Sequence, residues 1–182
     1  MSTENTKLRI REIILNWCET TNITIYGSFQ WLEGIPSVND IKILNAGELA
    51  FYISEKIICS QDISLLFLYM DSLLLKYKEN TQIVNTPDFL SIIAENNFVF
   101  IEAHSKIDNS LIRKISTAET LKSYLVKANI KPHKKHWFIL IIHPMKYIKR
   151  LGRAYIRYRT IIESRNISIL YTDQDIKEDI CL

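Results

Sequence analysis

The sequence predicts one α/β domain with a mixed central β-sheet flanked by helices. Its length of 182 residues suits a single domain, and 47% hydrophobic with 24% charged residues is ordinary for a globular protein. Helical and strand-like periodicities alternate along the chain, in the order helix, several strands, helix, strand, helix, strand. Consecutive strands favour an antiparallel meander, and a helix between two strands favours a crossover connection, so both strand orientations are expected in one sheet.

The first part, residues 1–44, is expected to contain a helix and a strand. Apolar residues recur at helical spacing over residues 6–20, and a strand-like stretch covers residues 22–32. A loop around Gly34 and Pro36 follows. We interpret this part as an extension that precedes the functional core.

The second part, residues 45–143, is expected to form that core. It begins with Asn45 as the cap of a helix over residues 46–60. Two apolar strands broken near Asp71 and Ser72 indicate a hairpin, and Pro87 marks a strand edge. The remaining elements are a strand, turn and strand over residues 91–106 with the turn at 95–97, a helix over 108–129 and a buried strand over 136–143.

The third part, residues 144–182, combines a basic helix over 144–164, a closing strand and an acidic tail. Residues 127–165 hold eleven Lys and Arg against the single acid Glu163, whereas the rest of the chain is acidic. This basic stretch predicts a DNA-binding face, because cations neutralise phosphates and interleaved tyrosines can stack. The alternative is an ordinary solvated helix face. The candidate DNA-binding residues are Lys146, Lys149, Arg150, Arg153, Arg157 and Arg159.

Several other classes of protein are disfavoured. The polar N-terminus does not resemble a signal peptide, and the longest apolar run, residues 137–143, is too short to span a bilayer, so we expect a cytoplasmic protein. The three scattered cysteines predict neither disulfides nor a zinc ribbon. No Gly-rich phosphate loop or GxSxG nucleophile motif occurs, and the spacing of His133, His136 and His143 favours structural or DNA-facing roles.

Two acids are expected to meet at one end of the sheet. Asp88 begins one strand, and Glu102 lies fourteen residues later near the end of the next. A tight hairpin would place their carboxylates side by side, where they could bind Mg²⁺ with its preferred oxygen ligands. Such an ion would activate water and stabilise the charge that grows on a scissile phosphate. Glu48, early on the preceding helix, is a candidate third ligand.

These motifs resemble the catalytic core of the TnsA family, the endonuclease subunit of heteromeric transposases. The segments that carry the resemblance are AGELAFYI with Glu48, ISLLFLYMDSLLLKY, NTPDFL with Asp88, IEAHSK beginning at Glu102, and the closing RYRTIIESRNISILYTDQDI. The resemblance implies a PD-(D/E)xK nuclease with a restriction-endonuclease-like core and Mg²⁺ or Mn²⁺ as cofactor. It further implies metal ligation by Asp88, Glu102, Glu48 and the backbone carbonyl of Ala103. The implied partners are DNA, a DDE-type transposase and an ATPase regulator.

One departure from the family pattern concerns the catalytic lysine. The triplet Glu102-Ala103-His104 has histidine where the family has lysine. Histidine is mostly neutral at pH 7 and shorter in reach. Lys106, two residues further along the same strand face, or Lys56, about two helical turns after Glu48, could replace the lysine.

Three functions therefore stay open at the level of sequence. The first is a TnsA-like endonuclease subunit that nicks donor DNA at a transposon end, with His104 or Lys106 assisting the attacking water. The second is a non-catalytic DNA-binding or assembly subunit with a degenerate nuclease site. The third is a stand-alone restriction or repair nuclease, because one fold can host several activities.

Overall fold

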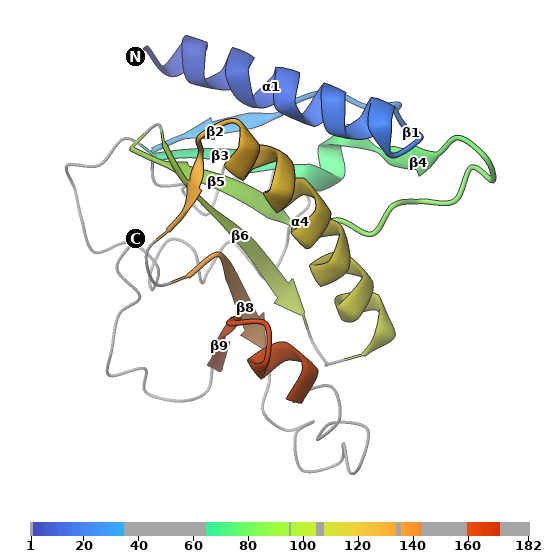
Figure 1. Cartoon of the computed structure of the whole chain (residues 1–182), viewed down its shortest axis with the longest axis vertical. Helices are drawn as coiled ribbons and strands as arrows, with labels where there is room; N and C mark the ends of the chain where they lie inside the picture. Colours follow the sequence, from blue (N-terminus) through green and yellow to red (C-terminus); the bar gives the residue numbers. More distant parts are fainter. Residues whose placement is uncertain are drawn as a thin grey trace.

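The computed structural model describes residues 2–34, 65–94, 96–104, 108–133, 136–142 and 160–171. Their centre is a seven-stranded mixed sheet with the strand order β2-β3-β5-β6-β8-β9, in which β7 also pairs with β6 (Figure 1). A separate two-stranded sheet joins β1 to β4. The strands are β1 (Ile23–Ile25), β2 (Trp31–Glu33), β3 (Leu65–Tyr69), β4 (Leu75–Tyr77), β5 (Phe89–Ile93), β6 (Asn97–His104), β7 (Lys131–Pro132), β8 (Phe138–Ile142) and β9 (Ser168–Tyr171).

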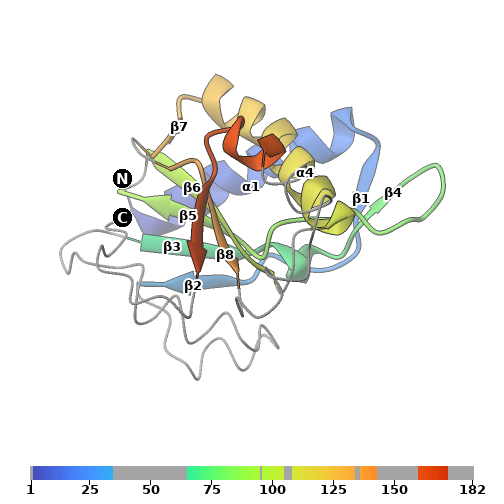
Figure 2. The ribbon, with the colours of Figure 1, turned by 90° about the horizontal axis from the view of Figure 1, so that it is seen from below.

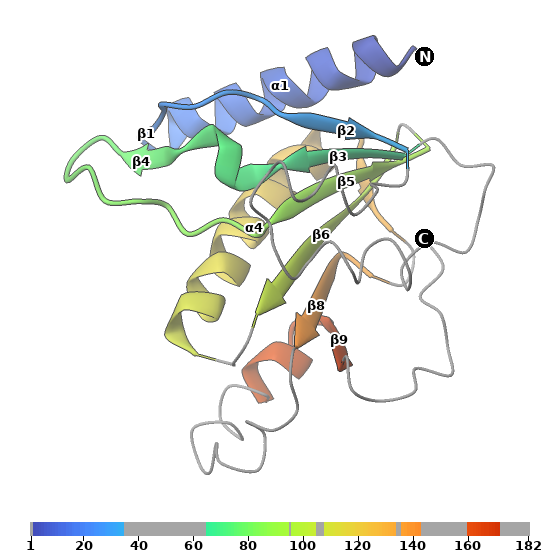
Figure 3. The same ribbon diagram turned by 180° about the vertical axis from the view of Figure 1, so that it is seen from behind.

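The sheet changes orientation at β6, as the order of elements predicts. Strands β2, β3, β5 and β6 are antiparallel neighbours, whereas β6, β8 and β9 run parallel. The β5–β6 connection is a tight hairpin that pairs Ile93 with Asn97, and Ala94 adopts a positive φ of 48° in its turn. Figure 3 shows this arrangement from behind, with the helices on the far side of the sheet. The mixed α/β class is therefore confirmed.

Two long helices cover one face of the sheet. Helix α1 (Thr3–Thr20) begins at Ser2, whose side chain caps the Asn5 N–H, and α4 (Asn109–Lys127) begins at the capping residue Asp108. Asn22 and Asn129 follow the two helix ends with positive φ, a conformation that Asn tolerates after a helix. Figure 2 shows α1 and α4 on the same side of the sheet.

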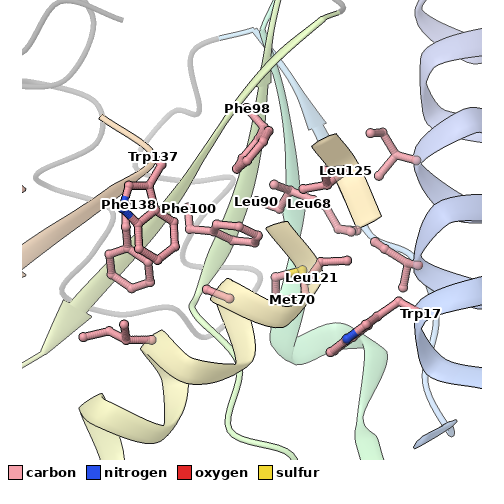
Figure 4. Close-up of a cluster of buried hydrophobic side chains, with 14 of the residues drawn as sticks. Trp17, Leu68, Met70, Leu90, Phe98, Phe100, Leu121, Leu125, Trp137 and Phe138 are labelled. Atoms are coloured by element: carbon pink, nitrogen blue, oxygen red, sulfur yellow. The ribbon is translucent and has the colours of Figure 1, made fainter. Parts of the chain in front are cut away.

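The main core lies between these helices and the sheet. Figure 4 shows Trp17 of α1 and Leu121 of α4 facing Leu68, Leu90 and Phe100 of the sheet, and all five are at most 1% exposed. The opposite side chains of the central strands, such as Phe67, Phe89 and Ile101, are buried as well. The helices are thus held against the sheet by close-packed apolar surface, which fixes the position of any polar side chain they carry.

The predicted hairpin around Asp71 and Ser72 is wrong. Strands β3 and β4 do not pair with each other, since β3 lies between β2 and β5 while β4 pairs with β1. A 3₁₀ helix (Met70–Leu73) and Leu74, with φ 46°, turn the chain out of the sheet after β3. The single strand expected over 22–32 is divided for the same reason, because Gly27 donates its N–H to the Leu73 carbonyl beside this turn.

The other elements agree with expectation where the structure describes them. The helix expected over 108–129 and the strands over 136–143 and 167–172 correspond to α4, β8 and β9, whereas the hairpin turn expected at 95–97 lies one residue earlier, between Ile93 and Asn97. The expected helix over 46–60 and most of the basic helix and acidic tail lie outside the described residues. Within the described part of the chain, no helix is both long and apolar enough to cross a membrane.

Candidate functional site

Asp88 and Glu102 form a cross-strand pair at one end of the β5–β6 hairpin. The register pairs Phe89 with Ile101, so Asp88, one residue before β5, lies opposite Glu102. Each carboxylate accepts a backbone N–H from the opposite strand: the Asp88 N–H donates to Glu102 Oε2 at 3.0 Å, and the Ala103 N–H donates to Asp88 Oδ2 at 2.8 Å. The fourteen-residue spacing and the short turn therefore bring the two predicted acids together.

Lys114 reaches the same two carboxylates from α4. Its Nζ lies 2.7 Å from Glu102 Oε1 and 3.6 Å from Asp88 Oδ1. Because both carboxylate oxygens contact the same nitrogen atom, they lie close to each other. The side chain of Glu102 is fully buried, while those of Asp88 and Lys114 are each 17% exposed. One ammonium thus lies between two carboxylates at the edge of the core.

His104 lies on the same strand face as Glu102, because alternate residues of a strand point the same way. Its Nδ1 is 3.0 Å from Glu102 Oε1, and its Nε2 is 3.3 Å from Asp108 Oδ1. Asp108 Oδ1 also accepts the Leu111 N–H at 3.1 Å and so caps α4. Both ring nitrogens of His104 therefore face carboxylates, one on the strand and one at the start of the helix.

A third acid, Asp71, contributes to this end of the sheet. It lies in the 3₁₀ helix directly after β3, and β3 is the neighbour of β5. Its Oδ1 accepts a hydrogen bond of 3.2 Å from the Thr86 hydroxyl, two residues before Asp88. Burial raises the pKa of Asp71, although the Lys114 charge and the Thr86 hydrogen bond oppose the rise. Asp71 is thus electrostatically coupled to the pair.

Burial and mutual repulsion perturb the ionisable groups of the site. Burial raises the pKa of Asp88 to about 7, and the Glu102 charge adds to this, while the Lys114 ammonium and the Ala103 N–H oppose it. The hydrogen bond to Glu102 raises the pKa of His104 despite burial of the ring. Burial alone would lower the pKa of Lys114, but the charges of Glu102 and Asp88 outweigh burial and raise it. Lys114 is therefore an ammonium at neutral pH.

The donor set suits a hard divalent cation that also binds a substrate phosphate. Within the residues that the structure describes, no three His, Cys, Asp or Glu side chains are grouped so as to hold a metal by themselves. Mg²⁺, however, commonly binds through one or two carboxylates and takes its other oxygens from water and phosphate. Asp88 and Glu102 provide two such carboxylates, and Asp88 is partly open to solvent. The pair therefore fits Mg²⁺ or Mn²⁺ in the presence of substrate.

The structure brings some of the predicted site residues together and leaves others undescribed. Asp88, Glu102 and His104 converge, and Ala103 lies between the last two with its N–H on Asp88. His133 and His136 stack with ring centroids 6.1 Å apart, away from this cluster in the sequence. The candidates outside the described residues are Glu48, Lys56, Lys106, His143, Lys146, Lys149, Arg150, Arg153, Arg157 and Arg159.

Sequence reasoning missed Lys114, Asp71 and Asp108. A signal existed for Lys114, because it lies three residues after the buried Leu111 and four before the buried Ala118, on the apolar side of a helix. A lysine there is rarely buried without a partner. Asp71 follows a strongly apolar strand, and Asp108 stands where a helix cap is expected.

Comparison of the chain with protein-family models, with curated proteins and with solved structures gives no match. The resemblance to the TnsA family is therefore an expectation from the sequence motifs alone.

Proposed function

We propose that this protein is a metal-dependent DNA endonuclease subunit, similar to TnsA, that nicks donor DNA at a transposon end. The observation that carries the proposal is the Asp88–Glu102 pair, in which each carboxylate accepts a backbone N–H from the opposite strand. One buried and one largely buried carboxylate side by side at the ends of two central strands repel each other, and such an arrangement is typical of sites that bind cations. The TnsA-like motifs supply the substrate class, DNA, and the proposed partners, a DDE-type transposase and an ATPase regulator.

The residues of the site would divide the work between binding and orientation. Asp88 and Glu102 would hold Mg²⁺ or Mn²⁺, which when bound supplies Lewis-acid stabilisation of the phosphate being cleaved. The N–H groups of Asp88 and Ala103 fix the two carboxylates in one orientation. Because the Glu102 side chain is buried in the core, bulk water does not solvate its carboxylate. The ligands are therefore held in position before substrate arrives.

A second candidate function is a non-catalytic DNA-binding subunit that keeps the fold. One observation favours it: Glu102 Oε1 already accepts from both Lys114 and His104. A carboxylate satisfied in this way needs no metal to balance its charge. On this alternative the charged cluster holds the ends of β6 and α4 together and has no chemical role.

A nicking assay separates the two functions. Wild-type protein, with transposase, regulator and a supercoiled plasmid bearing a transposon end, is expected to nick only with Mg²⁺ or Mn²⁺. Asp88→Ala is expected to abolish nicking, while Glu12→Ala, a matched loss of an exposed carboxylate on α1, should leave it intact. Nicking that survives Asp88→Ala would disprove the assignment of the catalytic site to Asp88, and DNA binding without nicking by the wild type would favour the second function.

A further inference from the structure

We propose that Lys114 is the catalytic cation of this site. Its ammonium, which lies beside the Asp88 and Glu102 carboxylates, contacts the phosphate that is being cleaved. This inference rests on the proposed endonuclease function and assigns a residue on α4 to it. The sequence directs attention to His104, Lys106 and Lys56. The geometry points instead to α4.

The first support is the position of the ammonium. Nζ of Lys114 lies 2.7 Å from Glu102 and 3.6 Å from Asp88, the two carboxylates that would bind the metal. A phosphate bridging to a cation held by these carboxylates must enter the same small volume. The side chain of Lys114 is 17% exposed, so it is not fully enclosed by the core. It is therefore placed to exchange a carboxylate contact for a phosphate contact.

The second support is the rigidity of the helix that delivers the lysine. Leu111, Ile115 and Ala118 surround Lys114 on α4 and are at most 1% exposed. The helix start is capped by Asp108, and the helix packs on the same core as α1 and the sheet. A catalytic group held by close packing loses little freedom on binding substrate, which favours catalysis.

The third support is that His104 is already engaged. Its two ring nitrogens face Glu102 at 3.0 Å and Asp108 at 3.3 Å. The ring thus links the end of β6 to the residue that precedes α4. Lys114 of α4 in turn contacts Glu102. His104 is accordingly a positioning residue: it fixes the start of α4, and so the place of Lys114, relative to Glu102.

The chemical step balances without a proton from Lys114. A water oxygen forms a bond to phosphorus, and the bridging P–O bond breaks with its electron pair on the departing oxygen. Solvent takes a proton from the water and returns one to the departing oxygen. Lys114 keeps its proton throughout and stabilises the negative charge on the phosphate oxygens in the transition state, as lysines do in other phosphoryl-transfer sites.

The test compares Lys114→Met with Lys78→Met, the same change at an exposed lysine just after β4, outside both the site and the basic stretch. Two quantities are measured on the full chain: single-turnover nicking by the reconstituted complex, and Mn²⁺ affinity of the protein alone by calorimetry. We expect Lys114→Met to slow nicking by about 10²-fold or more, the usual effect of removing one transition-state donor. We expect its Mn²⁺ affinity to be unchanged or higher, because a competing cation has been removed. Lys78→Met should resemble the wild type in both.

Lys114→Arg provides a second variant that keeps the positive charge, and it should retain more nicking than Lys114→Met. Nicking by Lys114→Met at the wild-type rate overturns the inference, while its dependence on Asp88 preserves the proposed function. Joint loss of nicking and Mn²⁺ binding in both Lys114 variants also overturns it, because Lys114 would then be a structural partner of the carboxylates. A wild type that never nicks refutes the proposed function and this inference together.

Discussion

Asp88→Asn is expected to stabilise the protein at alkaline pH, even though it removes a residue of the proposed active site. In the folded chain, burial and the neighbouring Glu102 charge raise the pKa of Asp88 from 3.8 to about 7. A carboxyl with a raised folded pKa contributes stability below its unfolded pKa, and this contribution is lost as pH rises toward the folded pKa. The ionised Asp88 is therefore a cost to the folded state at pH 8, and asparagine cannot ionise.

The size of the effect follows from the pKa change. A rise from 3.8 to about 7 corresponds to at most about 4 kcal/mol, at about 1.36 kcal/mol per pH unit. Asparagine keeps an oxygen for the Ala103 N–H but gives up the ion pair with Lys114, so we expect a net gain of about 1–3 kcal/mol at pH 8. Near pH 4 the two proteins should differ little, because Asp88 is then protonated in the folded state.

Urea unfolding followed by circular dichroism, in chelator-treated buffers from pH 4 to pH 9, measures this difference. The wild-type free energy of unfolding should fall relative to that of the variant between pH 4 and pH 7. Added Mg²⁺ at pH 8 should stabilise the wild type and leave the variant nearly unaffected, since ligands stabilise only the state that binds them. An Asp88→Asn protein that is less stable at pH 8, or whose difference does not change with pH, would refute the reasoning.

Three further predictions concern His104, Gly27 and the basic stretch. His104→Gln should destabilise the protein by about 1–2 kcal/mol at pH 6 and by less at pH 9, because the raised pKa of His104 gives stability below 6.5 that is lost as pH passes the folded value; equal losses in urea unfolding at both pH values would contradict this. Gly27→Ala should cost about 1–3 kcal/mol in the same assay, because a Cβ there would overlap the Ser72 carbonyl oxygen, and a neutral effect would show that the turn can move. Replacing Arg150, Arg153 and Arg157 with Ala should reduce the log–log salt dependence of DNA binding by up to about three, at about 0.9 per phosphate contact, whereas an unchanged slope would exclude this segment from the DNA interface.

The part of the site that the sequence could predict is local. Asp88 and Glu102 lie on two strands joined by a short turn, and period-2 alternation decides which face each side chain takes. The turn lies one residue earlier than the predicted 95–97, between Ile93 and Asn97, and this register places the two acids opposite each other. The same alternation predicts that His104 shares a face with Glu102.

The parts that the sequence could not predict depend on long-range packing. Periodicity identifies α4 as a helix, but the side of α4 that meets β6 is fixed by contacts such as Leu111 and Ile115 with the sheet. Lys114 reaches Glu102 only through this packing. The predicted pairing of β3 with β4 was wrong for a related reason, because apolar runs indicate strands but not which strands pair. The left-handed conformation of Leu74 also has no sequence signal, since leucine rarely adopts it.

The charges at this end of the sheet favour the proposed cation-binding role over a purely structural one. The carboxylates of Asp88 and Glu102 share the ammonium of Lys114, and those of Glu102 and Asp108 share the ring of His104. Buried ion pairs rarely stabilise a fold more than apolar side chains of similar volume would, because desolvation offsets their attraction. A cluster that only joined β6 to α4 would therefore gain nothing from the surplus carboxylate of Asp88, whose raised pKa marks it as destabilising when ionised. A cation-binding site needs that surplus negative charge, and proteins commonly tolerate such local instability where activity requires it.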